Sequence, residues 1–305
     1  MSKTIRIGTR DSELALWQAH TVQKKLNDLG YKTEITAVKS QGDIILDKPL
    51  YELGITGIFT KTLDIAMING QVDIAVHSMK DVPTALPIGI VQAAVLERAN
   101  TLDILVHKGN LDFLNGEGTI ATGSLRRQAQ WLNKYPNHKV VDLRGNVNTR
   151  MQKLQDSNWS GAVFAAAGLE RINLKPSNYI NLDWIIPAPA QGAMVIVAMA
   201  NDDFCRDAVA ELNDIETEVC THIERQFLKT LEGGCTAPIG ALATIQEDEI
   251  VFSGVLFSLD GKEKIEVNKI VPLEEWKKLG FIAAKEILDN GGVSLMERIR
   301  KDLKK

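Results

Sequence analysis

The sequence is poor in cysteine and has no large excess of charge of one sign. Its three cysteines, Cys205, Cys220 and Cys235, are odd in number and lack the spacing of metal ligands. They therefore indicate neither a disulfide framework nor a zinc site. The formal net charge is −4, so no general basic field would attract nucleic acid.

Long hydrophobic runs are also absent. The longest apolar stretches, Ala162–Leu169 and Ala193–Ala200, are far shorter than the ~20 residues that a membrane helix requires. The first residues, Met1–Gly8, contain no apolar region of the kind found in secretion signals. We therefore expect a cytoplasmic protein with reduced thiols and no membrane partner.

A chain of 305 residues is too long for one ordinary core, so two or three domains are expected. Short apolar runs alternate with helical patterns through the first two-thirds, which predicts α/β domains with parallel sheets. Near the C-terminus, three alternating segments, Ile239–Ile245, Ile250–Leu256 and Lys264–Val271, precede two helical ones. Strands followed by helices predict a separate small α+β domain.

One polar cluster directly follows a predicted strand. The apolar run Ile74–Val76 ends in His77, Ser78, Lys80 and Asp81, and Pro83 then interrupts regular structure. Ligands of open α/β sheets bind just past the carboxyl ends of strands. A carboxylate there could move protons or stabilise a developing cation. The alternative is a solvated loop with a Lys–Asp surface pair, which contributes little.

Arginine is concentrated at turns between predicted strands and helices. Helix N-termini favour anions, and the planar guanidinium group suits carboxylate or phosphate. Any one of these arginines could be an ordinary surface residue, but together they indicate anion recognition. Six of the twelve arginines lie in or near such turns: Arg10, Arg126, Arg127, Arg144, Arg150 and Arg171.

Cys235 differs from the other two cysteines because it follows Gly233 and Gly234 in a loop. Glycines allow a sharp turn and leave a thiol uncrowded. The thiol could be a nucleophile or a covalent tether. It could equally be a small buried apolar residue, as we expect for Cys205 and Cys220.

Seven segments taken together resemble the porphobilinogen deaminase family. They occur in the order of the family and cover nearly the full chain, which makes the match far more specific than any single motif. The segments are Ile7–Ala19, Gly42–Leu50, Val72–Pro83, Thr122–Gln130, Leu143–Arg150, Ala165–Arg171 and Leu231–Gly240.

The resemblance implies an α/β fold with two lobes of the type II periplasmic-binding kind and a small C-terminal α+β domain. Domain 1 would comprise residues 1–97 with a return segment, 193–213. Domain 2 would comprise residues 98–192, and residues 214–305 would form the domain with the cysteine loop.

The resemblance also implies a transferase. Four molecules of porphobilinogen would condense head to tail with loss of ammonia, giving hydroxymethylbilane for tetrapyrrole and haem biosynthesis. The growing chain would be built on a dipyrromethane cofactor attached through a thioether to Cys235. The family is usually monomeric, so we expect a monomer without a nucleic acid partner.

The resemblance assigns a role to each matching residue. Asp81 would be catalytic, and Phe59 would lie over the edge of a pyrrole ring. The cofactor would be bound by Cys235, Lys80, Ser78, Thr122, Ser124, Arg126, Arg127, Arg144 and Arg150. The substrate would be bound by Arg10, Ser12, Phe59, Arg144, Arg150, Arg171 and Gln191.

The sequence departs from the family pattern at four positions. Thr56 stands where a lysine is usual, and we assign it no binding role. Thr62 replaces a common glutamate, Gly123 a serine, and Ala190 a glycine.

A non-catalytic anion-binding module is the alternative interpretation, because solute receptors share the two-lobed architecture. Fold alone does not exclude it. The missing export signal, Cys235 and the third domain argue against a simple receptor.

Overall fold

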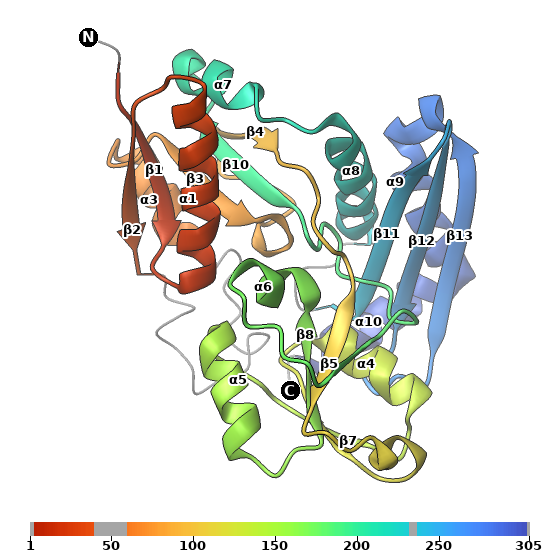
Figure 1. Cartoon of the computed structure of the whole chain (residues 1–305). Coiled ribbons are helices and arrows are strands. Elements are labelled where there is room, and N and C mark those ends of the chain that lie inside the picture. Colours follow the sequence, from red (N-terminus) through yellow and green to blue (C-terminus); the bar gives the residue numbers. More distant parts are fainter. Residues whose placement is uncertain (1–2, 40–59, 232–236, 304–305) are drawn as a thin grey trace. The chain divides into compact units, whose positions relative to one another are not determined.

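A computed structural model describes residues 3–39, 60–231 and 237–303 (Figure 1). Phe59, Thr56 and Cys235 lie outside the described residues, as does the segment Gly42–Leu50. The described chain forms two compact units. Unit 1 contains the N-terminal residues up to Ala99 together with Gly192–Glu218, and unit 2 contains Asn100–Gln191 and the chain from Val219 onward.

Unit 1 is built on a five-stranded sheet with the order β2-β1-β3-β10-β4. β1 pairs in parallel with β2 and β3, whereas β10 is antiparallel to β3 and β4. β10 therefore returns to unit 1 after the chain has passed through the first part of unit 2, Asn100–Gln191. The strands are β1 (Ile5–Arg10), β2 (Thr33–Val38), β3 (Ile74–Ser78), β4 (Ile90–Val95) and β10 (Met194–Met199).

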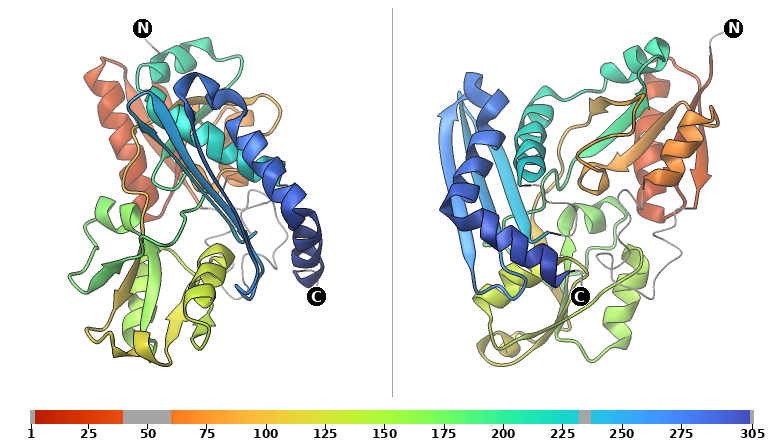
Figure 2. Two further views of the ribbon diagram at one scale, coloured as in Figure 1. Left: turned by 90° about the vertical axis from the view of Figure 1, so that its right-hand side faces the viewer. Right: turned by 180° about the vertical axis from the view of Figure 1, so that it is seen from behind.

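Helices cover both faces of this sheet (Figures 1 and 2). α1 (Glu13–Asp28) and α7 (Asp203–Ala210) pack on one face, and α3 (Lys61–Ile68) lies on the other. The buried residues Ala15, Ala19, Val22 and Leu26 recur every three or four positions in α1, which places them on one helix face. Complete burial of a side chain such as Leu26 contributes about 1.5–3 kcal/mol.

The first part of unit 2 repeats this topology, with the strand order β7-β6-β8-β5-β9. β6 pairs in parallel with β7 and β8, and β5 is antiparallel to β8 and β9. The strands are β5 (Asp103–His107), β6 (Thr119–Ala121), β7 (Lys139–Val141), β8 (Gly161–Ala165) and β9 (Tyr179–Asn181). The helices are α4 (Leu125–Lys134), α5 (Val147–Asp156) and α6 (Ala166–Arg171).

The C-terminal part of unit 2 is an antiparallel three-stranded sheet with helices on one face. On β12, Ile250, Phe252 and Leu256 alternate toward this helical core, whereas Val255 and Phe257 contact Ala129 of α4. The elements are α8 (Ile215–Thr230, beginning in unit 1), β11 (Ile239–Gln246), β12 (Glu249–Phe257), β13 (Lys264–Pro272), α9 (Trp276–Ile287) and α10 (Val293–Asp302). Two lobes of equal topology and a separate C-terminal sheet confirm the predicted fold class.

The proline-rich segment that contains Ile186 and Pro187 connects the two parts of unit 2 through hydrogen bonds. The backbone of Ile186 donates to Gln130 Oε1 at 2.8 Å, and its carbonyl accepts from Gln130 Nε2 at 2.9 Å. The carbonyl of Pro187 accepts from the backbone of Ala241 on β11 at 3.0 Å. These bonds fix α4 relative to the C-terminal sheet.

No helix among the described residues is both long enough and apolar enough to cross a membrane.

Candidate active site

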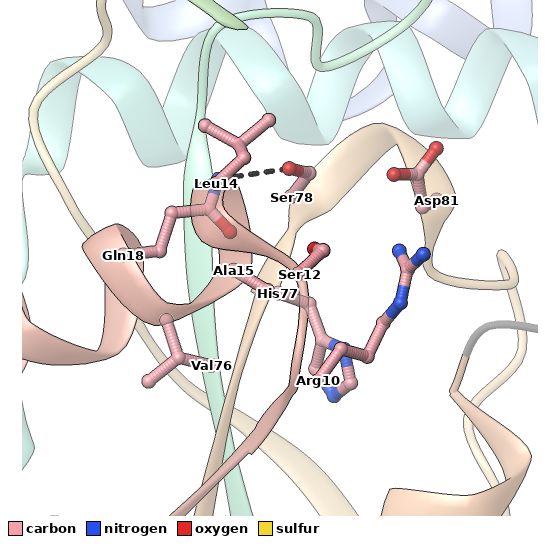
Figure 3. Close-up of a pocket in the computed structure, with 9 residues that line it drawn as sticks. All are labelled: Arg10, Ser12, Leu14, Ala15, Gln18, Val76, His77, Ser78 and Asp81. Carbon is pink, nitrogen blue, oxygen red and sulfur yellow. Dashed lines mark hydrogen bonds between the residues drawn. The ribbon is translucent and has the colours of Figure 1, made fainter. Parts of the chain in front are cut away.

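A pocket opens in unit 1 at the carboxyl ends of β1 and β3 (Figure 3). The two strands are parallel neighbours, so Arg10 at the end of β1 and Ser78 at the end of β3 reach the same edge of the sheet. A short 3₁₀ turn, Met79–Asp81, then carries Asp81 to the pocket. The lining residues are Arg10, Ser12, Leu14, Ala15, Gln18, Val76, His77, Ser78 and Asp81.

Buried neighbours hold Asp81 in place. Met79 and Val82 are 2% and 5% exposed, and the backbone of Met79 donates to the carbonyl of Ala193 at 3.0 Å. Asp81 itself is partly exposed, and in Figure 3 the side chain of Arg10 extends toward it. Lys80, on the same turn, is partly exposed but does not line the pocket. Among the lining residues that the structure describes, Asp81 is the only carboxylate.

His77 is buried in the wall of the pocket, and its Nε2 has no hydrogen-bond partner among the described residues. Burial lowers the pKa of its imidazole to about 4, with a further contribution from the positive charge of Arg10. The ring is therefore neutral at pH 7. Arg10 and Asp81 remain as the charged residues of the pocket lining.

We expect this low pKa to make the stability of the protein depend on pH. In the unfolded chain histidine has a pKa of ~6.5, so the unfolded state binds more protons than the folded state between pH 6.5 and 4. The contribution of His77 to the free energy of unfolding is then fully present above pH 6.5 and falls by on the order of 3 kcal/mol as the pH decreases to 4. Urea unfolding at pH 7.5 and pH 5, for wild type and His77→Gln, measures this contribution. Equal pH dependence in both proteins would contradict it.

A second group of predicted site residues meets around Asp103 in unit 2. Asp103 is completely buried and forms ion pairs of 2.7 Å with both Arg126 and Arg127. Its pKa is well below the usual range because the two guanidinium groups outweigh the effect of burial. Two positive charges face one negative charge here, so the cluster keeps a net charge of +1.

The guanidinium group of Arg127 uses more of its N–H groups in hydrogen bonds than that of Arg126 does. Arg127 Nη1 also donates to the carbonyl of Val163 at 3.0 Å. Arg126 Nη1 donates to the carbonyl of Ile186, but its buried Nε has no hydrogen-bond partner among the described residues. Gln191 Nε2 donates to Asp103 Oδ1 at 2.9 Å and so joins the same cluster. Sequence reasoning missed Asp103, although an acidic residue opening the apolar run Ile104–Val106 was a usable signal.

The other predicted residues of unit 2 lie at two helix N-termini and one helix end. Ser124 caps α4 by accepting from the backbone of Arg127 at 3.4 Å, and Thr122 is buried just before it. Arg144 precedes the N-cap of α5, and Arg150 lies in its first turns. Burial lowers the pKa of Arg144, and it lowers the pKa of Arg171, at the end of α6, to about 10.

The structure shows the local effect of two of the departures from the family pattern, Ala190 and Gly123. Ala190 has a φ of 63°, a left-handed conformation that glycine adopts without strain. Its backbone N–H donates to the buried Glu224 at 2.6 Å, which holds the conformation. A Cβ on Gly123 would lie 2.6 Å from the carbonyl oxygen of Leu143, so a serine there would require a backbone shift. Thr62 lies in α3 and is not among the described residues that line the pocket.

Comparison with known proteins gives consistent matches over the chain. Residues 5–207 match the family model described as "Porphobilinogen deaminase, dipyromethane cofactor binding domain", and residues 218–289 match "Porphobilinogen deaminase, C-terminal domain". The chain is 40% identical to the porphobilinogen deaminase of Desulfitobacterium hafniense, with 99% of each chain covered. It is 38% identical to the porphobilinogen deaminase of Chlorobium phaeobacteroides, again with 99% of each chain covered.

Similarity to solved structures is much lower. The periplasmic VFT2 domain of Bordetella pertussis BvgS shares 13% sequence identity at a TM-score of 0.42, covering 68% of this chain and 86% of that chain. A TM-score this low supports no inference about function. The family models and the full-length relatives, by contrast, agree with each other and with the ordered motifs of the sequence. The chain belongs to the porphobilinogen deaminase family.

Proposed function

We propose that the chain joins four porphobilinogen molecules head to tail with release of ammonia, on a dipyrromethane cofactor attached to Cys235, and so forms hydroxymethylbilane. The observation that carries this proposal is the unit 1 pocket, where Asp81 is the only carboxylate among the described lining residues and Arg10 supplies a neighbouring cation. Family membership over the full chain supports it. The family resemblance also favours a cytoplasmic monomer and the three domains 1–97 with 193–213, 98–192, and 214–305.

The pocket suits a substrate that carries both signs of charge. Porphobilinogen has acetate and propionate groups and a cationic aminomethyl group. Loss of ammonia leaves a cation conjugated with the pyrrole ring. Asp81 stabilises this positive charge from close range and can accept a proton from a pyrrole nitrogen. Arg10 and Ser12 bind a carboxylate of the substrate and orient the ring toward Asp81.

The described residues of unit 2 also fit a cofactor with several carboxylates. The Asp103 cluster keeps one net positive charge, and Arg126 Nε is a buried donor without a partner among the described residues. The capped N-terminus of α4 adds oriented N–H groups. When bound, the cofactor supplies the pyrrole carbon that the first substrate joins. By the family resemblance, the unit 2 residues that hold it would be Thr122, Ser124, Arg126, Arg127, Arg144 and Arg150, and Arg144, Arg150, Arg171 and Gln191 would also contact substrate. The resemblance assigns Ser78 and Lys80, which belong to unit 1, to cofactor binding as well.

The mass of the intact purified protein tests this function. We expect the wild type to carry the added mass of two linked pyrrole units and Cys235→Ser to lack it, because a hydroxyl does not replace the thiolate nucleophile. Cys220→Ser serves as the matched control, since Cys220 is buried in α8 and should leave the added mass unchanged. An unmodified wild type that still binds porphobilinogen would favour the anion-binding module instead.

A further inference from the structure

Gln18 is a buried amide directed at one residue of the pocket. It lies on α1, is 2% exposed, and donates from Nε2 to Ser78 Oγ at 2.8 Å (Figure 3). Burying an amide is costly unless it is hydrogen-bonded, so this bond determines the orientation of the Gln18 side chain.

The bond also determines what Ser78 can do. A serine hydroxyl has one proton to donate and two lone pairs that accept. Because Ser78 Oγ already accepts from Gln18, its own proton is directed elsewhere. Ser78 is partly exposed and lines the pocket, so the hydroxyl presents this proton to a ligand.

The neighbouring residues favour an anionic ligand at this side of the pocket. Arg10 contributes a cation, and the Ser12 side chain makes no capping hydrogen bond to α1. His77 is neutral at pH 7 because burial lowers its pKa to about 4. Hydroxyl donors beside a guanidinium group match a carboxylate.

We propose that Gln18 is a positioning residue: by donating to Ser78 Oγ, it fixes the Ser78 hydroxyl as a hydrogen-bond donor to a carboxylate of the pyrrole ligand. The inference rests on the proposed function. The carboxylate belongs to the incoming substrate or to the attached cofactor, which share the same chemistry.

Two substitutions of Gln18 separate positioning from packing. Gln18→Glu, studied at pH 8, can only accept, so the Ser78 proton turns toward the glutamate and away from the ligand. Gln18→Met fills a similar volume without accepting or donating, so Ser78 stays free to donate to the ligand. A packing role predicts that both substitutions are equally harmful, whereas positioning predicts that Gln18→Glu is much worse.

A double-mutant cycle with Ser78→Ala separates positioning from simple charge repulsion. If Gln18→Glu acts through Ser78, it adds little once the hydroxyl is gone. If its negative charge repels the ligand directly, its full effect persists in Gln18→Glu/Ser78→Ala.

Two experiments distinguish the sources of the carboxylate. The substrate arm uses cofactor-loaded protein and measures, by calorimetry, the Kd of a porphobilinogen analogue in which methyl replaces the aminomethyl group. The cofactor arm measures, by mass spectrometry, how fast apo-protein acquires the two-pyrrole mass. We expect Gln18→Glu to be about 10- to 100-fold worse than wild type in at least one arm, which identifies the source of the carboxylate. Gln18→Met removes the donor that orients Ser78 without reversing the bond, so it should be about three- to fivefold worse than wild type, clearly less than Gln18→Glu; the double variant should stay within about threefold of Ser78→Ala.

Wild-type behaviour of Gln18→Glu in both arms would overturn the inference. So would equal effects of Gln18→Glu and Gln18→Met, or an undiminished effect of Gln18→Glu in the Ser78→Ala background. Each of these results leaves the proposed function standing, provided that the wild type carries the added mass at Cys235. An unmodified wild type would instead refute the proposed function itself.

Discussion

Asp81→Asn should lower kcat at least about a hundredfold while the two-pyrrole mass remains attached. Asparagine keeps the size of the side chain but removes the negative charge that stabilises the cation left by loss of ammonia. Asp81 is partly exposed, so no buried charge is left unpaired, and the melting temperature should change little. Turnover is measured by hydroxymethylbilane formation, and cofactor content by the mass of the intact protein.

Controls separate a catalytic role of Asp81 from a general effect of charge near the pocket. Asp11→Asn removes an exposed carboxylate that immediately follows Arg10 but does not line the pocket. We expect this variant to keep nearly all activity. Asp81→Glu keeps the charge but moves it by one methylene, so its activity should lie between those of wild type and Asp81→Asn. A wild-type rate in Asp81→Asn would remove Asp81 from the mechanism.

Local pattern predicted the elements around the pocket well. Serine is a common N-cap residue and glycine commonly follows the end of a helix, and α1 has Ser12 at its N-cap and ends at Asp28, two residues before Gly30. The run Ile74–Val76 was expected to be a buried strand followed by polar residues; β3 is that strand but continues to Ser78, so only Lys80 and Asp81 lie past its end. These features depend on neighbours in the sequence, namely hydrophobic period, capping residues and Pro83.

Local sequence pattern could not predict which strands pair when they are far apart in the sequence. Every residue from Met194 to Ala198 is buried, so the pattern of β10 fits any central strand and does not identify β3 and β4 as its neighbours. The family resemblance supplied only the expectation that residues 193–213 return to domain 1. The same limit explains why Asp103 was missed, since Arg126 and Gln191 lie 23 and 88 residues away in the sequence and only the fold brings them together.

Asp103→Leu should destabilise unit 2 by about 3–5 kcal/mol, because it leaves Arg126 and Arg127 buried without a counter-charge. Asp103→Asn keeps an acceptor for Gln191 and should be less harmful. Urea unfolding followed by tryptophan fluorescence reports on this unit, because four of the five tryptophans, Trp131, Trp159, Trp184 and Trp276, belong to it.

The matched control for Asp103 is an ion pair in solvent. Asp28 pairs with Lys24 at the surface of α1, with both side chains more than half exposed, so Asp28→Asn should change stability by less than ~0.5 kcal/mol. Adding Arg127→Met to Asp103→Leu should restore part of the lost stability, since one buried charge is removed with its partner. If Asp103→Leu were as stable as Asp28→Asn, the buried cluster would not hold unit 2 together. The reason for a completely buried carboxylate beside two arginines would then have to be sought in ligand binding alone.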